Sequence, residues 1–87
     1  MDARFHLQRV VIQTDSQYCY VGTLAEASEA WLTLKDVVTI DNNERRLSLD
    51  EVLVECRQEH HRPNRREVLI PASRLISISL LDDVLEE

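Results

Sequence analysis

The sequence predicts a mainly β domain: a small, five-stranded, strongly bent antiparallel barrel that stays open, with one helix inserted between its third and fourth strands. Three observations predict it. Runs rich in β-branched and aromatic residues recur along the chain. The only glycine, Gly22, falls inside one of these runs, and a capping pattern at Ser48 opens the one clear helical segment. A chain of 87 residues has room for one domain, which is predicted to span residues 1–87.

The first half of the chain is predicted as an antiparallel meander of three strands. Apolar and polar residues alternate in the first run, residues 15–17 form a polar turn, and aromatic and β-branched residues fill the next two runs. Residues 25–30 are too few for a stable helix, so they are predicted as a long hairpin connection. A glycine inside a strand usually marks a bulge or a bend, and Gly22 is the basis for the strong bend. The predicted strands are residues 7–14, 18–24 and 31–40.

A helix is predicted over residues 49–60. Ser48 and Glu51 have the spacing of a capping box, and the acidic first turn suits the positive end of the helix dipole. Pro63 ends the segment, and two short strands, residues 67–70 and 75–81, complete the domain. Residues 42–66 therefore form a helical and basic insertion. The apolar stripe of this helix is Leu49, Val52, Leu53 and Cys56.

Charge is distributed unevenly along the chain. The formal net charge is −6, yet residues 57–66 hold four arginines against one glutamate. Arginine pairs in a planar, two-pronged way with carboxylates and with phosphates alike. Two interpretations stay open: Arg62, Arg65 and Arg66 pair with acids of this chain or of a neighbouring copy, or they contact phosphates. The acidic balance favours the first, because general nucleic-acid binders carry a basic face.

Side chains suited to covalent or metal chemistry are few. Cys56 and His60 lie one helical turn apart and His61 follows, but a closed zinc site needs four ligands. An apolar stripe that ends in a cysteine, followed by solvated histidines, is the favoured interpretation. Cys19 has no evident base partner for nucleophilic catalysis, and a single glycine excludes a glycine-rich phosphate loop. We expect no enzymatic activity, metal, cofactor or small-molecule substrate.

The sequence also bears on the compartment. Two cysteines cannot form the disulfide framework of a small secreted domain, which fits a reduced, cytoplasmic setting. Every uncharged stretch is far shorter than the roughly 20 apolar residues of a membrane span, and no apolar signal-peptide core follows the N-terminus. A cytoplasmic protein without membrane contact is expected.

Two stretches resemble the two motifs of Sm and Sm-like proteins. Residues 10–24 show a strand with alternating valines, a turn, an aromatic residue two before a glycine and an aliphatic residue two after it; Tyr20, Gly22 and Leu24 match this triplet. Residues 68–78 resemble the second motif, a short strand, a tight turn and a final strand. The resemblance implies a small open barrel whose two edge strands join between copies, giving a closed homo-oligomeric ring. The implied subunit edges are Val68, Leu69, Ile70, Ile76, Ser77 and Ile78.

The resemblance also implies RNA binding, although the residues of the family's uridine pocket are replaced. Where the family has an Asp, an Asn and an Arg-Gly pair, this chain has Ser28, Leu32 and Pro71-Ala72. One expectation is therefore RNA binding through an altered surface, with Trp31 either stacking a base or lying in the core. The other is a protein-interaction scaffold without nucleic-acid activity. The candidate RNA contacts are Trp31, Arg62, Arg65, Arg66 and Arg74.

Overall fold

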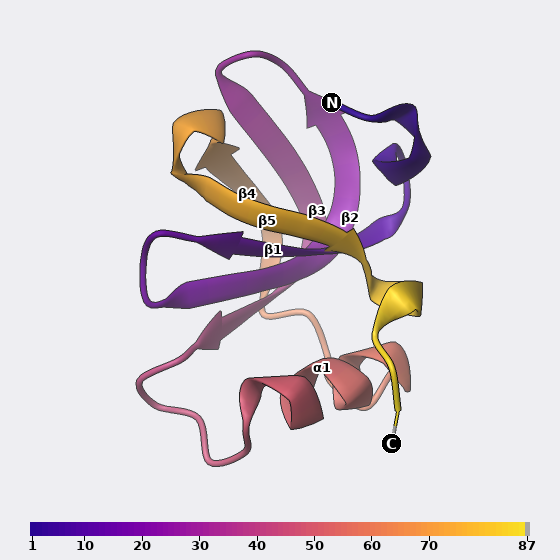
Figure 1. Cartoon of the computed structure of the whole chain (residues 1–87), viewed down its shortest axis with the longest axis vertical. Helices are drawn as coiled ribbons and strands as arrows, with labels where there is room; N and C mark the ends of the chain where they lie inside the picture. The colour runs from indigo at the N-terminus through magenta and orange to yellow at the C-terminus, as the bar shows by residue number, and fades with distance from the viewer. Residues whose placement is uncertain (87) are drawn as a thin grey trace.

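A computed structural model describes residues 1–86 and folds them into one antiparallel sheet with a helix between its third and fourth strands (Figure 1). This confirms the predicted mainly β class and the place of the helix. The order across the sheet is β4-β3-β2-β1-β5, so β4 and β5 are its two edges. The elements are β1 (Arg9–Thr14), β2 (Tyr18–Ala27), β3 (Trp31–Asp41), α1 (Leu49–Arg57), β4 (Arg65–Pro71) and β5 (Leu75–Leu80), with 3-10 turns at Ala3–Phe5, Ala72–Arg74 and Leu81–Asp83.

The strong bend predicted from Gly22 is not found, because the sheet is neither closed nor strongly curled. Gly22 serves a different purpose. A Cβ at this position would lie 3.1 Å from both the Lys35 carbonyl oxygen and Val37 Cγ2, and 3.3 Å from Leu34 Cβ. The β2–β3 register shifts between Val21 and Thr23, so the ladder is irregular beside the glycine, with the extra residue on β3. Gly22 therefore permits a close approach of β3 at a local irregularity.

Several element ends differ from the prediction for local reasons. Strand β1 starts at Arg9 because Leu7, predicted as strand, has a φ of 59°. The connection between β2 and β3 is a tight turn, not a long loop, because the Ser28 Oγ accepts hydrogen bonds from the amides of Ala30 (3.3 Å) and Trp31 (3.1 Å). Helix α1 ends at Arg57, before the predicted end, and Glu59 then turns into the left-handed region with a φ of 62°.

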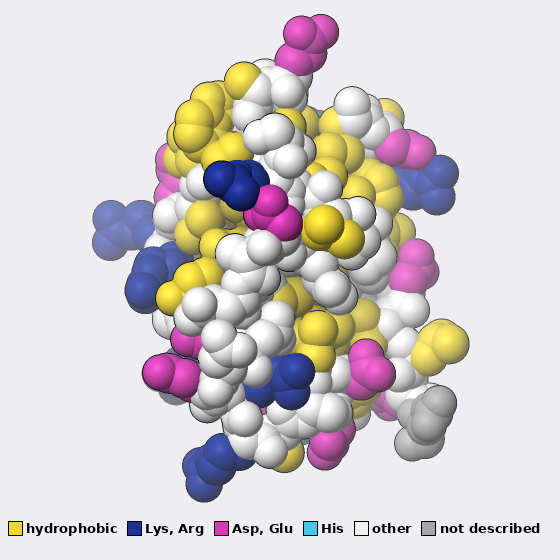
Figure 2. Space-filling view, turned by 60° about the vertical axis from the view of Figure 1, so that its left-hand side comes forward, with side chains coloured by type: hydrophobic (Ala, Val, Ile, Leu, Met, Phe, Trp, Pro, Cys, Tyr) yellow, Lys and Arg dark blue, Asp and Glu magenta, His cyan; other side chains and the backbone are white. Residues whose placement is uncertain are grey.

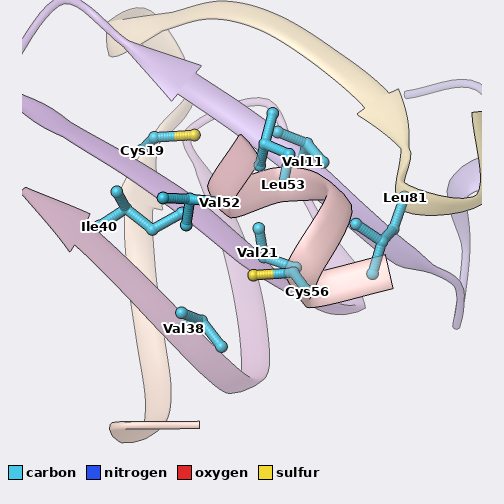
Figure 3. Close-up of a cluster of buried hydrophobic side chains, with 9 residues drawn as sticks. All are labelled: Val11, Cys19, Val21, Val38, Ile40, Val52, Leu53, Cys56 and Leu81. Carbon is cyan, nitrogen blue, oxygen red and sulfur yellow. The ribbon is translucent and has the colours of Figure 1, made fainter. Parts of the chain in front are cut away.

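The start of α1 is as predicted. The Ser48 side chain accepts from the Glu51 amide, and the Glu51 side chain accepts from the Ser48 amide, which completes the capping box. The buried face of α1 covers one face of the sheet, and the two elements share a hydrophobic cluster (Figure 3). The members of this cluster are Val11, Cys19, Val21, Val38, Ile40, Val52, Leu53, Cys56 and Leu81.

A second hydrophobic cluster lies on the opposite face of the sheet, because neighbouring residues of a strand point to opposite faces. Along β1, Val11 belongs to the helix-side cluster while Val10 and Ile12 belong to the second one. Side chains from both edge strands pack against this second cluster. Its buried members are Val10, Ile12, Leu24, Leu32, Leu34, Val37 and Ile70.

Candidate interaction edges of the sheet

The first candidate site is the outer side of β4. The amides of Asn64 and Ala72 donate to the carbonyls of Val37 and Ala30, both at 2.8 Å, so the even-numbered residues of this segment direct their backbone groups toward β3. Backbone groups alternate along an antiparallel strand. The amides and carbonyls of Arg65, Glu67 and Leu69 therefore face away from β3 and have no strand beside them within residues 1–86.

The second candidate site is the outer side of β5. The Leu24 amide donates to the Gln8 carbonyl at 3.0 Å, so alternate residues of β1 from Gln8 onward are directed toward β2. Val11 and Gln13 are then directed toward β5, where they pair with Ser79 and Ser77. It follows that the backbone groups of the remaining alternate residues, Ile78 and Leu80, face outward.

The predicted edge residues divide by exposure. Leu69 on β4 is 52% exposed and Ile76 on β5 is 67% exposed, values that are high for large apolar side chains. Figure 2 shows one face of the molecule, on which apolar side chains lie in groups among charged ones. The other predicted edge residues contribute through their backbones: Ile70 is buried, Val68 and Ile78 are half-buried against the second hydrophobic cluster, and Ser77 is an exposed polar residue.

The two loops that would form the family's uridine pocket do lie side by side. The Ala72 amide donates to the Ala30 carbonyl at 2.8 Å, and Trp31 pairs with Pro71 across the β3–β4 ladder. Trp31 is 48% exposed, so the interpretation of this residue as a core tryptophan is wrong. Leu32, however, is only 1% exposed. Since Ser28 is engaged in its own turn, the loops present few side-chain hydrogen-bonding groups to a base.

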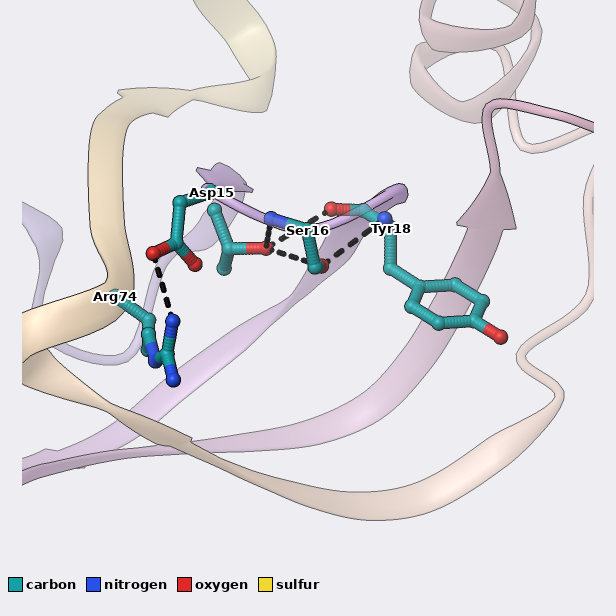
Figure 4. Close-up of polar contacts among 5 residues, drawn as sticks. Asp15, Ser16, Tyr18 and Arg74 are labelled. Atoms are coloured by element: carbon teal, nitrogen blue, oxygen red, sulfur yellow. Dashed lines mark hydrogen bonds and ion pairs between the residues drawn. The ribbon is translucent and has the colours of Figure 1, made fainter.

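Arg74, a predicted RNA contact, is bound within the chain. Its Nη1 lies 2.9 Å from Asp15 Oδ2, and the Asp15 amide donates to the Arg74 carbonyl at 3.1 Å (Figure 4). The neighbouring turn is ordered by Thr14 and Ser16, whose hydroxyl oxygens are 2.7 Å apart. Arg74 thus joins the start of β5 to the β1–β2 turn.

The other predicted arginine contacts gather at the start of β4. Arg62, Arg65 and Arg66 are exposed, and none of them forms an ion pair with another residue of the described part of the chain. Arg65 lies opposite Val37 while Trp31 lies opposite Pro71, which places the tryptophan and the arginines about 20 Å apart along β3. The structure therefore does not bring Trp31 and the arginines into one site.

Sequence reasoning missed one set of charged residues. Asp82 and Asp83 lie, with Leu81, in the 3-10 turn that follows the β5 edge directly. The signal was present in the sequence, because two consecutive acids follow the predicted last strand without an intervening loop. Only the sheet order shows that this strand is an edge.

The cysteines and histidines are placed away from the edges. Cys19 and Cys56 lie in the helix-side cluster, where burial raises the pKa of the Cys19 thiol to about 11 and also raises the pKa of Cys56. A thiol with a raised pKa is a poor nucleophile at neutral pH. His61 Nε2 lies 2.7 Å from Glu55 Oε1, at the exposed end of α1. Within residues 1–86 there is no group of three or more His, Cys, Asp or Glu side chains with the geometry of a metal site.

No protein-family model matches this sequence, and no curated protein matches it either. In the part of the chain that the structure describes, no helix combines the length and apolar character needed to cross a membrane.

Proposed function

We propose that this protein is a non-enzymatic, Sm-like module that assembles with copies of itself, β4 of one copy pairing with β5 of the next into a closed ring. The observation that carries the proposal is the pair of edges on one sheet, each with outward backbone groups and an exposed aliphatic side chain, Leu69 or Ile76. Exposed edges of this kind are templates for pairing with another chain.

The strand order supports head-to-tail assembly. Because β4 and β5 are different strands, pairing one with the other is heterologous, and such contacts repeat until the rotation closes a ring. Two positions that resemble the first Sm motif support this proposal: Gly22 lies where β2 and β3 approach closely, and Leu24 is buried in the second hydrophobic cluster. The proposal gives the two cysteines no catalytic role, because both are buried and their raised pKa values keep the thiols protonated at neutral pH.

Light scattering coupled to size-exclusion chromatography tests the assembly. The expected mass is several times the 10.1 kDa of one chain. A single Lys on an edge should oppose pairing, so Leu69→Lys is expected to shift the mass toward one chain. Leu7→Lys is the matched control, because Leu7 is 63% exposed and lies outside both edge strands. A wild-type protein that elutes as a clean monomer at micromolar concentration would contradict the proposal.

RNA binding is a second candidate function, favoured by one observation. Arg62, Arg65 and Arg66 are three exposed cations at the start of one strand, and no carboxylate of residues 1–86 is paired with them. Titration of the protein with labelled oligo-uridine and oligo-adenosine at low and moderate salt tests it. Salt-dependent binding of both would support a phosphate-contacting surface. No binding at low salt would leave the protein-interaction scaffold as the function of the assembly.

A further inference from the structure

Two oppositely charged clusters flank the two edges of the sheet. Arg65 and Arg66 open β4, and Asp82 and Asp83 follow the last residue of β5. All four side chains are exposed, and none of them forms an ion pair inside the described chain. The one hydrogen bond from these side chains is local, from Arg65 Nη1 to the carbonyl of Asn64 at 2.8 Å.

The neighbouring charges are already engaged. Arg4 acts electrostatically on Asp83 but forms its ion pair with Asp2 at 2.8 Å. Arg57 pairs with Glu86, 3.5 Å apart. On β4 itself, Glu67 is bound by Lys35 of β3, so it does not neutralise the arginines beside it. The local electrostatics thus leaves a basic cluster at one edge and an acidic cluster at the other.

Antiparallel pairing of the edges brings the two clusters together. When Leu69 of one copy is set opposite Ile76 of the next, Glu67 lies opposite Ile78 and Arg65 opposite Leu80. Arg65 and Glu67 on β4, and Ile78 and Leu80 on β5, are residues whose backbone groups face outward, as hydrogen-bonded pairs require. Asp82 and Asp83 come two and three residues after Leu80, in the 3-10 turn Leu81–Asp83, so they fall beside the arginines at the start of the adjoining β4. Parallel pairing would instead set Arg65 beside the start of β5, away from both aspartates.

We infer that Arg65 and Arg66 of one copy form ion pairs with Asp82 and Asp83 of the neighbouring copy, and that these pairs fix the antiparallel direction and register of the edge contact. The inference rests on the proposed assembly and names what orients it. Arginine is suited to this role because its planar guanidinium binds a carboxylate through two parallel hydrogen bonds. The occupant of each edge is accordingly a second copy of this chain, selected by charge as well as by backbone pairing.

A charge-swap experiment tests the inference. The two parent variants are Arg65→Glu with Arg66→Glu, and Asp82→Arg with Asp83→Arg; the third protein carries all four changes. The midpoint concentration of assembly is measured by sedimentation velocity at low salt. Each parent variant is expected to raise this midpoint about tenfold or more, because attraction across the contact becomes repulsion. The four-fold variant is expected to return close to the wild-type midpoint.

The matched control for the arginine parent is Arg45→Glu with Arg46→Glu, which makes the same change in net charge in the loop before α1. It is expected to leave the midpoint within about twofold of wild type. Circular dichroism melts of every variant verify that each is folded. The inferred ion pairs would be contradicted if the parent variants assembled like wild type, or if the four-fold variant did not recover. Neither result would contradict the proposed assembly. A monomeric wild-type protein would instead overturn the proposed function and the ion pairs together.

Discussion

Arg74 and Asp15 form an ion pair that joins the start of β5 to the turn between β1 and β2, with 2.9 Å between Nη1 and Oδ2. Both side chains are well exposed, so the pair contributes little to the stability of the fold. The ion pair instead affects what Arg74 can bind. A phosphate at Arg74 would have to compete with a carboxylate already in place, whereas Arg62, Arg65 and Arg66 meet no such competitor among residues 1–86. The arginines at the start of β4 are therefore the stronger candidates for intermolecular contacts.

Gly22→Val is expected to lower the free energy of unfolding by about 1–3 kcal/mol. The reason is the space around the position, since even a Cβ would approach the Lys35 carbonyl oxygen and Val37 Cγ2 to 3.1 Å. The backbone of Gly22 does not have a positive φ, so backbone strain contributes nothing. Urea denaturation measures the change, and Thr33→Val on β3 is the control for a valine at a half-buried strand position. Equal stability of Gly22→Val and wild type would contradict the close approach.

Ser48→Ala is expected to lower the free energy of unfolding by about 1 kcal/mol. The substitution removes the side chain that accepts from the Glu51 amide at 3.2 Å, and it leaves that donor without its cap. Ser73→Ala, at an exposed serine that caps no α-helix, is expected to change stability by less than about 0.5 kcal/mol. Thermal melts followed at 222 nm compare the two. A Ser48→Ala protein as stable as Ser73→Ala would show that the capping box does not support α1.

Burial of Cys19 predicts a loss of stability at alkaline pH. Its pKa is about 11 in the folded protein against an ordinary value of 9.0, because burial disfavours the thiolate. Below pH 9 the thiol is protonated in both the folded and the unfolded chain. As the pH rises from 9 to 11 the unfolded chain releases the proton first, so the folded state loses up to about 2–3 kcal/mol relative to it.

Denaturation at several pH values between 8 and 11.5 measures this loss. The variant Cys19→Val cannot ionise at this position and keeps an apolar side chain there, so its stability is expected to fall less steeply over the same interval. Parallel pH profiles for the variant and the wild type would argue against a buried, protonated thiol at position 19.

A triple variant in which Arg62, Arg65 and Arg66 are all changed to Ala distinguishes pairing with acids from contact with phosphates. If the arginines pair with acids of a neighbouring copy, the triple variant is expected to assemble less stably, while affinity for any RNA hardly moves. We expect this outcome because the acids of a second copy are brought to the arginines by edge pairing itself. If they contact phosphates instead, the variant would bind oligo-uridine and oligo-adenosine equally less well, with a shallower salt dependence and an intact assembly. Fluorescence anisotropy measures the RNA affinity and light scattering measures the assembly, both at the same salt concentrations.

Local signals in the sequence explain which elements could be predicted. The capping residues Ser48 and Glu51 lie three apart and act within one helical turn, so the start of α1 was predictable. Its end was not, because the left-handed turn at Glu59 occurs at a residue type that gives no signal for it. Gly22 correctly indicated a close approach of strands. It did not indicate the overall curvature, which depends on the whole sheet rather than on one missing Cβ.

The candidate site was predictable only in pieces. The edge residues and the arginines could be named from the chain, but their exposure depends on which strands have a neighbour. Trp31 shows this, because residue type alone left both the core and a base-stacking surface open to it, and the side chain is exposed at the end of the β3–β4 ladder. The proposed pairing of Arg65 with Asp82 likewise needs the strand order, because only that order shows that β4 and β5 are the two edges of the sheet.

Disulfide trapping across the edges tests whether β4 of one copy pairs with β5 of the next. In the proposed register Leu69 of one copy lies opposite Ile76 of the next, with Cα atoms about 4.5–5.5 Å apart, a separation that a disulfide spans. The single variants Leu69→Cys and Ile76→Cys are prepared and oxidised separately and as a mixture; Cys19 and Cys56 are buried and give little background. If β4 of one copy pairs with β5 of the next, covalent dimers are expected in the mixture alone. Dimers in either separate sample to the same extent would show like edges pairing with each other, and no dimers in the mixture would contradict the pairing of β4 with β5.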